Sequence, residues 1–269
     1  MPSQKISFKG KPVYFYEIGS GFPVVFLHGF NESVNIWNKT IENISKKFRC
    51  ILIDLPGFGN SPLPENLSIK YIAESVKRVV DELYIPKPLI IGHSMGAYVA
   101  LEYLKNFPKA LSGIGFIHST SYPDSEDKKT NRLKTLEFLE NNSVDTFFKI
   151  FIQGLVAPHN YKKEILDEIE KIILNTRKQS VIDGIKAMLN RNDNFEVYKN
   201  SDLPMLILAG KYDQLIPLEK MTKQASETKN AMIEILNNSG HLGMIEEPEK
   251  TEKAIIKFAE WVEFSLKNK

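Results

Sequence analysis

The fold is decided by residues 88–100, which read PLIIGHSMGAYVA. The apolar run that opens this stretch is typical of a buried strand, and the small residues from Ala97 onward are typical of a helix packed on a sheet. Between them lies a Gly-x-Ser-x-Gly pattern centred on Ser94. In a sharp strand-to-helix turn, Gly92 and Gly96 leave no side chain to clash with the serine hydroxyl. We therefore predict a nucleophilic Ser94 rather than an ordinary glycine-rich turn.

The predicted helix adds a second chemical feature. The amide of Met95 lies at its N-terminus, where it would point at an oxyanion formed on an acyl carbon held by Ser94. A five-residue pattern occurs by chance in many chains. The rest of the sequence must therefore supply a base, an acid and a second oxyanion donor.

The composition excludes several classes of partner. The chain has 269 residues, enough for a substantial core, and its 35 lysines and arginines nearly balance 33 aspartates and glutamates. We therefore expect neither nucleic acid nor a membrane surface as a partner. Residues 1–11 contain no signal-peptide core, and no run is long enough to span a membrane. We expect a cytoplasmic protein.

The single cysteine, Cys50, fits that expectation. One cysteine can form neither an intramolecular disulfide nor a cysteine-based metal cluster, which suits a reducing compartment. Its neighbours, FRCILI over residues 48–53, predict a buried strand position rather than a reactive thiol.

Strands and helices alternate along the first part of the chain. Alternating polar and apolar residues predict an antiparallel edge pair at about 5–9 and 12–18. Apolar runs predict further strands at 23–27, 48–55, before Gly92, and at 111–117, with helices at about 33–47, 69–84 (capped by Ser68) and from the elbow to 107. This alternation requires right-handed crossovers and a mostly parallel, doubly wound sheet.

The rhythm changes after residue 121. Only helical patterns of aromatic and aliphatic residues follow, and we predict an inserted helical cap, some of whose side chains line a cavity above Ser94. The predicted division is a core of 1–121 and 201–269 with a cap of 122–200. Strands then resume at 204–209 and 232–236, with helices at about 217–227 and 248–266.

Two polar residues follow these late strands. Asp213 comes after the strand at 204–209, and His241 comes after the strand at 232–236. The carboxyl ends of parallel strands share one edge, so Ser94, Asp213 and His241 are predicted to converge there. Either residue alone would be an ordinary loop residue, but the order serine, acid, histidine favours a triad. His241 would be the base, and Asp213 would orient it.

Two earlier loops have supporting roles. The loop after the strand at 23–27 begins with His28, Gly29 and Phe30, and the Phe30 amide is the candidate for the second oxyanion donor. We expect His28 to fix the loop by hydrogen bonding rather than to transfer protons. For Asp54 we favour loop bracing through backbone hydrogen bonds over a catalytic role.

Together these motifs resemble those of enzymes with the α/β-hydrolase fold, over about residues 5–266. The matching stretches are HGF at 28–30, DLPGFG at 54–59, GHSMG at 92–96, GKYD at 210–213 and SGH at 239–241. The resemblance implies the nucleophile Ser94, the acid Asp213, the base His241 and oxyanion amides from Phe30 and Met95. It implies no cofactor.

The resemblance leaves the substrate open, because this fold supports many reactions. Ser94 stands where dehalogenase-like and epoxide-hydrolase-like members have aspartate, which disfavours those two reactions. Leu242 stands where carbon–carbon bond hydrolases usually have tryptophan, which makes that activity a less favoured alternative. Ala97 and Tyr98 stand where relatives in menaquinone synthesis tend to have arginine. No lysine or arginine is plainly placed for a substrate carboxylate, although the cap has enough of both to supply one. The default substrate is an uncharged ester.

The sequence thus predicts a lidded serine esterase, a monomer or homodimer, that cleaves a small or medium carboxylic ester through an acyl-enzyme. A carbon–carbon bond hydrolase or a haloperoxidase-like enzyme of the same fold is the enzymatic alternative. A non-catalytic ligand receptor that signals through cap movement is the alternative of another class. Absent turnover combined with ligand-dependent thermal stabilisation would identify a receptor.

Overall fold

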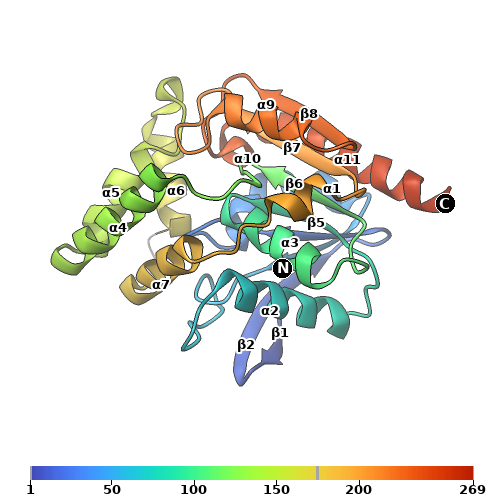
Figure 1. Cartoon of the computed structure of the whole chain (residues 1–269), viewed down its shortest axis with the longest axis horizontal. Helices are drawn as coiled ribbons and strands as arrows, with labels where there is room; N and C mark the ends of the chain where they lie inside the picture. The colour runs from blue at the N-terminus through green and yellow to red at the C-terminus, as the bar shows by residue number, and fades with distance from the viewer. Residues whose placement is uncertain (1, 174–175, 269) are drawn as a thin grey trace.

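The computed structural model describes residues 2–173 and 176–268 (Figure 1). Its strands are β1 (Ser3–Phe8), β2 (Lys11–Ile18), β3 (Pro23–Leu27), β4 (Arg49–Ile53), β5 (Leu89–His93), β6 (Gly113–Ile117), β7 (Met205–Gly210) and β8 (Ala231–Leu236). Its α-helices are α1 (Asn38–Ser45), α2 (Ile69–Glu82), α3 (Met95–Asn106), α4 (Glu126–Asn141), α5 (Val144–Gln153), α6 (Lys163–Ile173), α7 (Lys178–Leu189), α8 (Phe195–Lys199), α9 (Leu218–Ser226), α10 (Gly243–Glu246) and α11 (Pro248–Lys267). Two 3₁₀ helices, η1 (Val34–Trp37) and η2 (Pro158–Asn160), complete the set.

The strands form one sheet in the order β1-β2-β4-β3-β5-β6-β7-β8. β2 pairs antiparallel with both β1 and β4, whereas β4, β3, β5, β6, β7 and β8 run parallel to one another. The predicted mostly parallel sheet with an antiparallel edge pair is therefore confirmed. Because β3 and β5 to β8 run in one direction, the loops after them meet along a single edge.

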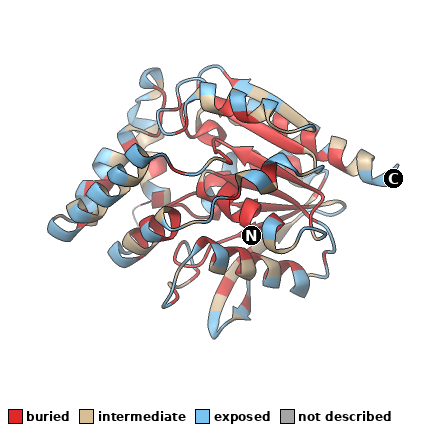
Figure 2. Ribbon diagram, viewed as in Figure 1, coloured by how far each residue is buried: buried red, intermediate tan, exposed pale blue. Residues whose placement is uncertain are grey.

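Helices cover both faces of this sheet. α2, α3, α8 and α9 lie on one face, and α1 and α11 pack together on the other (Figure 1). Figure 2 shows the central strands buried throughout, as their continuous apolar sequences predict. Ser68 caps α2 by accepting a hydrogen bond from the Tyr71 amide, as predicted.

The segment between β6 and β7 contains helices and no strand within the residues described. α4 to α7 stand to one side of the sheet in Figure 1, whereas α8 packs on α3 in the core. The apolar pattern of this segment predicted more buried residues than the structure has. Leu133 and Ile150, for example, are 54% and 60% exposed. In α4 the only buried residue is Leu139, so this helix is held by few apolar contacts.

One predicted helix begins differently. The segment expected to be helical over 33–47 opens with η1, whose first amide, that of Val34, donates to the Asp54 carboxylate at 2.9 Å. The same carboxylate accepts the Asn60 amide at 2.9 Å. Asp54 therefore braces two loops, as the sequence predicted.

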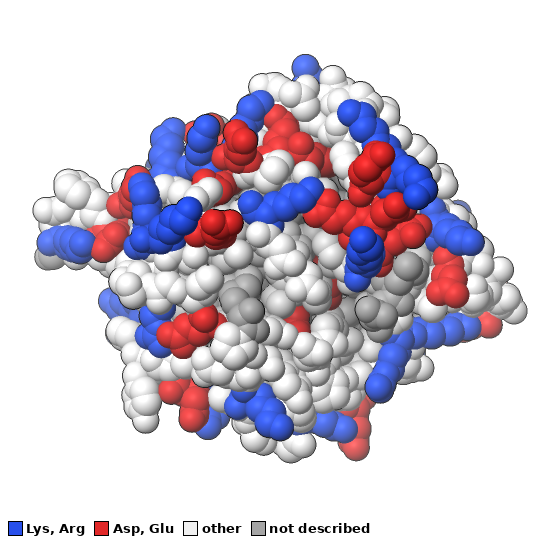
Figure 3. Space-filling model, turned by 180° about the vertical axis from the view of Figure 1, so that it is seen from behind, with Lys and Arg blue, Asp and Glu red and all other residues white. Residues whose placement is uncertain are grey.

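The surface agrees with the balanced composition. Acidic and basic side chains are interspersed on the face shown in Figure 3, so neither sign dominates it. Among the residues described, each helix is too short or too polar to cross a membrane.

Candidate active site

Ser94 occupies a strained turn between β5 and α3. Its φ of 46° and ψ of −112° lie where residues with a side chain rarely occur. The turn is held by its own backbone: the Ser94 amide donates to the Ile117 carbonyl at 2.9 Å, and the Ser119 hydroxyl donates to the Ser94 carbonyl at 2.8 Å. These bonds fix the side chain at the edge of the sheet, where it lines a cavity.

Close packing behind the turn explains the second glycine of the pattern. A Cβ at Gly96 would lie 2.5 Å from the Leu27 carbonyl oxygen and 2.8 Å from that of His28. The N-terminus of α3 thus packs directly against the end of β3. A side chain larger than hydrogen would separate the two, and with them the amides of Phe30 and Met95.

These two amides were predicted as oxyanion donors, and the structure places them on the facing segments just described. Met95 is the first residue of α3, where an amide has no intrahelical acceptor. His28 holds the Phe30 loop: its Nε2 accepts the Leu55 amide at 2.9 Å, so its Nδ1 donates to the Gly29 carbonyl at 2.8 Å. Both nitrogens of a neutral ring are thereby used, and burial lowers the pKa of His28. His28 fixes this loop, as predicted.

Asp213 and His241 lie together at the same edge. Nδ1 of His241 donates to Oδ2 of Asp213 at 2.8 Å, and Oδ1 accepts the amides of Leu215 and Ile216 at 2.9 Å each. Burial raises the pKa of the Asp213 carboxyl. The nearby His241 and the hydrogen bonds that Asp213 accepts outweigh burial and hold this pKa well below its usual range. Since the carboxylate fixes the proton on Nδ1, the Nε2 of His241 is left as the free ring nitrogen.

Ser94 and His241 line one cavity of about 430 Å³. The described hydrogen bonds include none between the Ser94 hydroxyl and the imidazole. Such bonds are often long in enzymes without ligand and shorten when substrate binds. The structure thus brings together all three residues that the sequence singled out, with the acid–base pair in direct contact.

His118 is a second imidazole beside Asp213, and the sequence did not identify it. Its Nε2 accepts the Gly243 amide at 3.0 Å, which leaves the proton on Nδ1, 3.7 Å from Oδ2 of Asp213. Burial lowers the pKa of His118 to about 4, so the ring is neutral. His118 directly follows β6, so the strand-end rule that identified Asp213 also pointed to it.

A buried ion pair was also missed. Nδ1 of His93 donates to Oε2 of Glu32 at 2.9 Å, and Nε2 donates to the His241 carbonyl at 2.9 Å. With both nitrogens donating, His93 is an imidazolium. Burial alone would lower the pKa of His93, but the Glu32 carboxylate has the larger effect and raises that pKa. Burial alone would raise the pKa of Glu32, but the His93 ring has the larger effect and lowers that pKa. Glu32 also accepts the Gly29 amide at 2.7 Å. The pair therefore ties the Phe30 loop, the elbow and the His241 loop together.

The walls of the cavity come largely from α4, α5 and α7. Apolar side chains of α5 and α7 face it, and these are Phe147, Phe151, Ile185 and Met188. Polar residues of the first turns of α4 also face it, and these are Ser125, Asp127, Lys128, Asn131 and Arg132. The sequence left open whether the cap places a basic residue at the substrate, and the structure answers that Lys128 and Arg132 reach the cavity.

The cap is tied to the His241 loop through the chain after α5. The His241 amide donates to the Leu155 carbonyl at 2.7 Å. The Glu246 carboxylate accepts the amides of Gly240 and Ala157 at 2.8 Å each. One side chain thus fixes both the loop of the predicted base and the cap segment above it.

One sequence prediction concerns a residue outside this site. Cys50 is buried in β4, and burial raises the pKa of its thiol to about 12, so it is no reactive thiolate. In the residues described, no group of three histidine, cysteine or carboxylate side chains is arranged to hold a metal ion.

Comparisons with known proteins agree with this architecture. A sequence profile of the alpha/beta hydrolase fold matches residues 23–248. The human monoacylglycerol lipase ABHD6 is 26% identical over 295 residues, which cover 98% of this chain and 81% of that protein. A thermophilic esterase from Thermogutta terrifontis superposes with a TM-score of 0.91 at 26% identity, over 97% of this chain and 99% of that one. An enol-lactonase from Burkholderia xenovorans, at 17% identity and a TM-score of 0.86, shares the fold.

Proposed function

Because the chain belongs to the alpha/beta hydrolase family, we propose that this hydrolase cleaves carboxylic esters through a triad of Ser94, His241 and Asp213. The observation that carries the proposal is the 2.8 Å bond from His241 Nδ1 to Asp213, which leaves Nε2 free in the cavity that Ser94 lines. A neutral imidazole in this tautomer is the form that accepts a proton from a serine hydroxyl.

The first half of the reaction acylates Ser94. His241 Nε2 takes the hydroxyl proton while Oγ attacks the ester carbonyl carbon, and Asp213 stabilises the imidazolium that forms. The amides of Phe30 and Met95 donate to the oxyanion of the tetrahedral intermediate. The imidazolium then gives its proton to the departing alcohol as the carbon–oxygen bond breaks.

The second half regenerates the enzyme. His241 takes a proton from a water molecule, whose oxygen attacks the acyl carbon, and a second oxyanion forms in the same place. Return of the proton to Ser94 Oγ releases the carboxylic acid.

Kinetics on a chain-length series of p-nitrophenyl esters test the proposal. Ser94→Ala should lower kcat by about a million-fold, as deletion of the nucleophile does in other serine hydrolases. Ser125→Ala is the matched control, because Ser125 also lines the cavity but lies at the start of α4. It should retain kcat within about threefold for short neutral esters. Equal turnover by Ser94→Ala and the wild type would rule the mechanism out.

The proposal also extends to organisation and surroundings. We propose that α4 to α7, within the predicted cap of 122–200, act as a cap on a core of 1–121 and 201–269 to which α8 also belongs. We also propose that the protein acts in the cytoplasm on a small-molecule ester, without a cofactor. The cap role is supported by the cavity walls contributed by α4, α5 and α7.

A further inference from the structure

We propose that this cavity binds esters that carry a second, ionised carboxylate, and that the carboxylate is bound at a cationic end formed by Tyr98, Lys128 and Arg132. The inference rests on the proposed esterase function and concerns the same cavity. It replaces the uncharged ester that the sequence suggested as the default.

The cationic end carries an excess of positive charge. Arg132 Nε donates to Asp124 at 2.6 Å, and Arg191 donates to the other oxygen of the same carboxylate at 2.8 Å. All three side chains are largely buried. Burial raises the pKa of Asp124, but the two arginines outweigh burial and hold the pKa well below its usual range. Two guanidinium groups thus share one carboxylate, and a positive charge is left over.

Lys128 adds another positive charge to the cationic end. Its ammonium group donates to the Leu215 carbonyl at 3.2 Å, and the described ion pairs give it no carboxylate partner. The positive charge of Lys128 also acts on the neighbouring Lys220: burial lowers the pKa of Lys220, and repulsion by Lys128 lowers it further. Asp127 lines the cavity as well, but it is exposed to solvent, where its charge is screened.

Tyr98 supplies a hydroxyl donor at the wall of the cavity. Tyr98 is 6% exposed and lines the cavity, and its hydroxyl takes part in none of the hydrogen bonds described. The Arg191 guanidinium lies 4.3 Å from the centre of its ring. Burial raises the pKa of the phenol, but the surrounding cations, Lys128 foremost, outweigh burial and lower the pKa. A phenol so polarised is a strong donor to an anionic oxygen.

Position links this end to the chemistry. Ser94 directly precedes α3, Tyr98 lies in the first turn of that helix, and both residues line the same cavity. An ester bound at Ser94 would reach the cationic end through a few methylene groups. Carboxylates of this reach occur on the acyl side of dicarboxylic acid monoesters, or on the alcohol side of esters of hydroxy acids.

The experiment compares matched charged and neutral esters on the full-length protein. For the acyl side, mono-p-nitrophenyl adipate is compared with p-nitrophenyl hexanoate; for the alcohol side, 4-acetoxybenzoate is compared with 4-acetoxybenzamide. We expect kcat/KM to favour the charged member of at least one pair by about tenfold at low salt, and the preference to shrink as salt is added.

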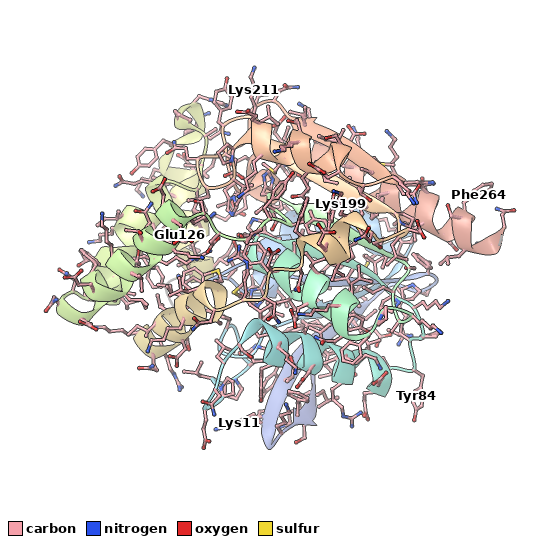
Figure 4. All side chains as sticks on the ribbon, in the orientation of Figure 1. Lys11, Tyr84, Glu126, Lys199, Lys211 and Phe264 are labelled. Carbon is pink, nitrogen blue, oxygen red and sulfur yellow. The ribbon has the colours of Figure 1, made fainter. Side chains whose placement is uncertain are left out.

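Two lysine variants make the comparison specific. Lys128→Met should lower kcat/KM for the favoured charged ester by about tenfold and leave its neutral partner within about twofold. Lys129→Met is the control, because Lys129 is the next residue of α4 but does not line the cavity. Its ammonium group pairs instead with Glu126, which Figure 4 labels. Its charged-to-neutral ratio should equal that of the wild type.

The outcomes separate this inference from the proposed function. Turnover of the neutral esters without preference for either charged ester would overturn the inference alone. A charge preference that Lys128→Met and Lys129→Met leave equally unchanged would also overturn it. If the wild type hydrolyses none of the four esters faster than Ser94→Ala, the proposed function itself fails.

Discussion

The two sides of the cavity are built in different ways. On the sheet side, Ser94, Asp213 and His241 are buried or strained, and hydrogen bonds from the ends of neighbouring strands fix them. On the cap side, α4 has Leu139 as its only buried residue, and its cavity-facing residues are polar and partly exposed. Under the proposed function, the sheet edge would carry out the reaction, and α4 to α7 would determine which ester is accepted. Figure 4 shows Tyr84 and Phe264, both strongly exposed, on the far side of the molecule from the cap.

The largest expected effect breaks the sheet side. Asp213→Asn keeps the volume of the side chain but replaces the oxygen that accepts the Nδ1 proton of His241, so the ring is no longer held in the required tautomer. We expect kcat for a neutral ester to fall by about 10⁴-fold, as in other triads. Circular dichroism should show an unchanged fold, and a fall of less than tenfold would contradict the assigned role.

His118 provides a pH test of the same region. Its pKa in the folded protein, about 4, lies below the unfolded value of about 6.5, so its contribution to stability is present above 6.5 and is lost as pH falls toward 4. When the pH falls from 7 to 4, the free energy of unfolding should decrease in both proteins, but by about 3 kcal/mol less in His118→Asn than in the wild type. Urea titrations at both pH values measure this difference. Parallel losses in the two proteins would contradict a buried, neutral His118.

The Glu32–His93 pair tests whether the loops of the sheet edge act as one unit. In Glu32→Gln, kcat should fall by about tenfold with little change in KM, because a small displacement of the His241 loop misplaces the base. A merely structural role for the pair would leave kcat of the folded fraction unchanged.

The same variant has a pH signature. The pKa of His93 is raised, so its contribution to stability is full below its unfolded value and is lost as pH rises through the folded one. The pKa of Glu32 is lowered, so its contribution is full above its unfolded value. The stability difference between wild type and Glu32→Gln should therefore be largest between about pH 4.5 and 6.5 and shrink at higher pH. A difference that grows at alkaline pH would contradict an imidazolium at His93.

The smallest expected effect changes the cap side. Phe151 lines the cavity from α5 and stacks on Phe147, with ring centres 5.3 Å apart. Phe151→Ala should shift the optimum of the neutral p-nitrophenyl series toward longer acyl chains and change kcat/KM for the acetate by only about threefold. Loss of activity on every chain length alike would instead place Phe151 with the catalytic side.

The sheet edge was predictable from sequence because its rules are local. The Gly-x-Ser-x-Gly pattern between a predicted strand and a predicted helix singled out Ser94. Asp213 and His241 were singled out because each lies in the loop after a predicted strand, and parallel strands end at one edge of the sheet. The same local reasoning predicted that Asp54 and His28 brace loops, and their hydrogen bonds confirm it.

The missed residues depend on packing between distant segments. Glu32 and His93 are 61 positions apart and meet only after β3 and β5 pair. For Lys128 and Arg132 the difficulty lies in the helix itself. α4 is polar on most of its surface, so its sequence pattern does not indicate which side faces the cavity. Only the docking of the cap decides it.

Covalent labelling tests the central claim most directly. The purified protein is treated with a fluorophosphonate, and the modified peptide is identified by mass spectrometry. The account predicts one adduct, on Ser94, formed in the wild type and strongly reduced in Asp213→Asn, because the hydroxyl reacts only when His241 is held by the carboxylate. An adduct on another residue, or an unmodified Ser94 in a protein that still hydrolyses esters, would contradict it.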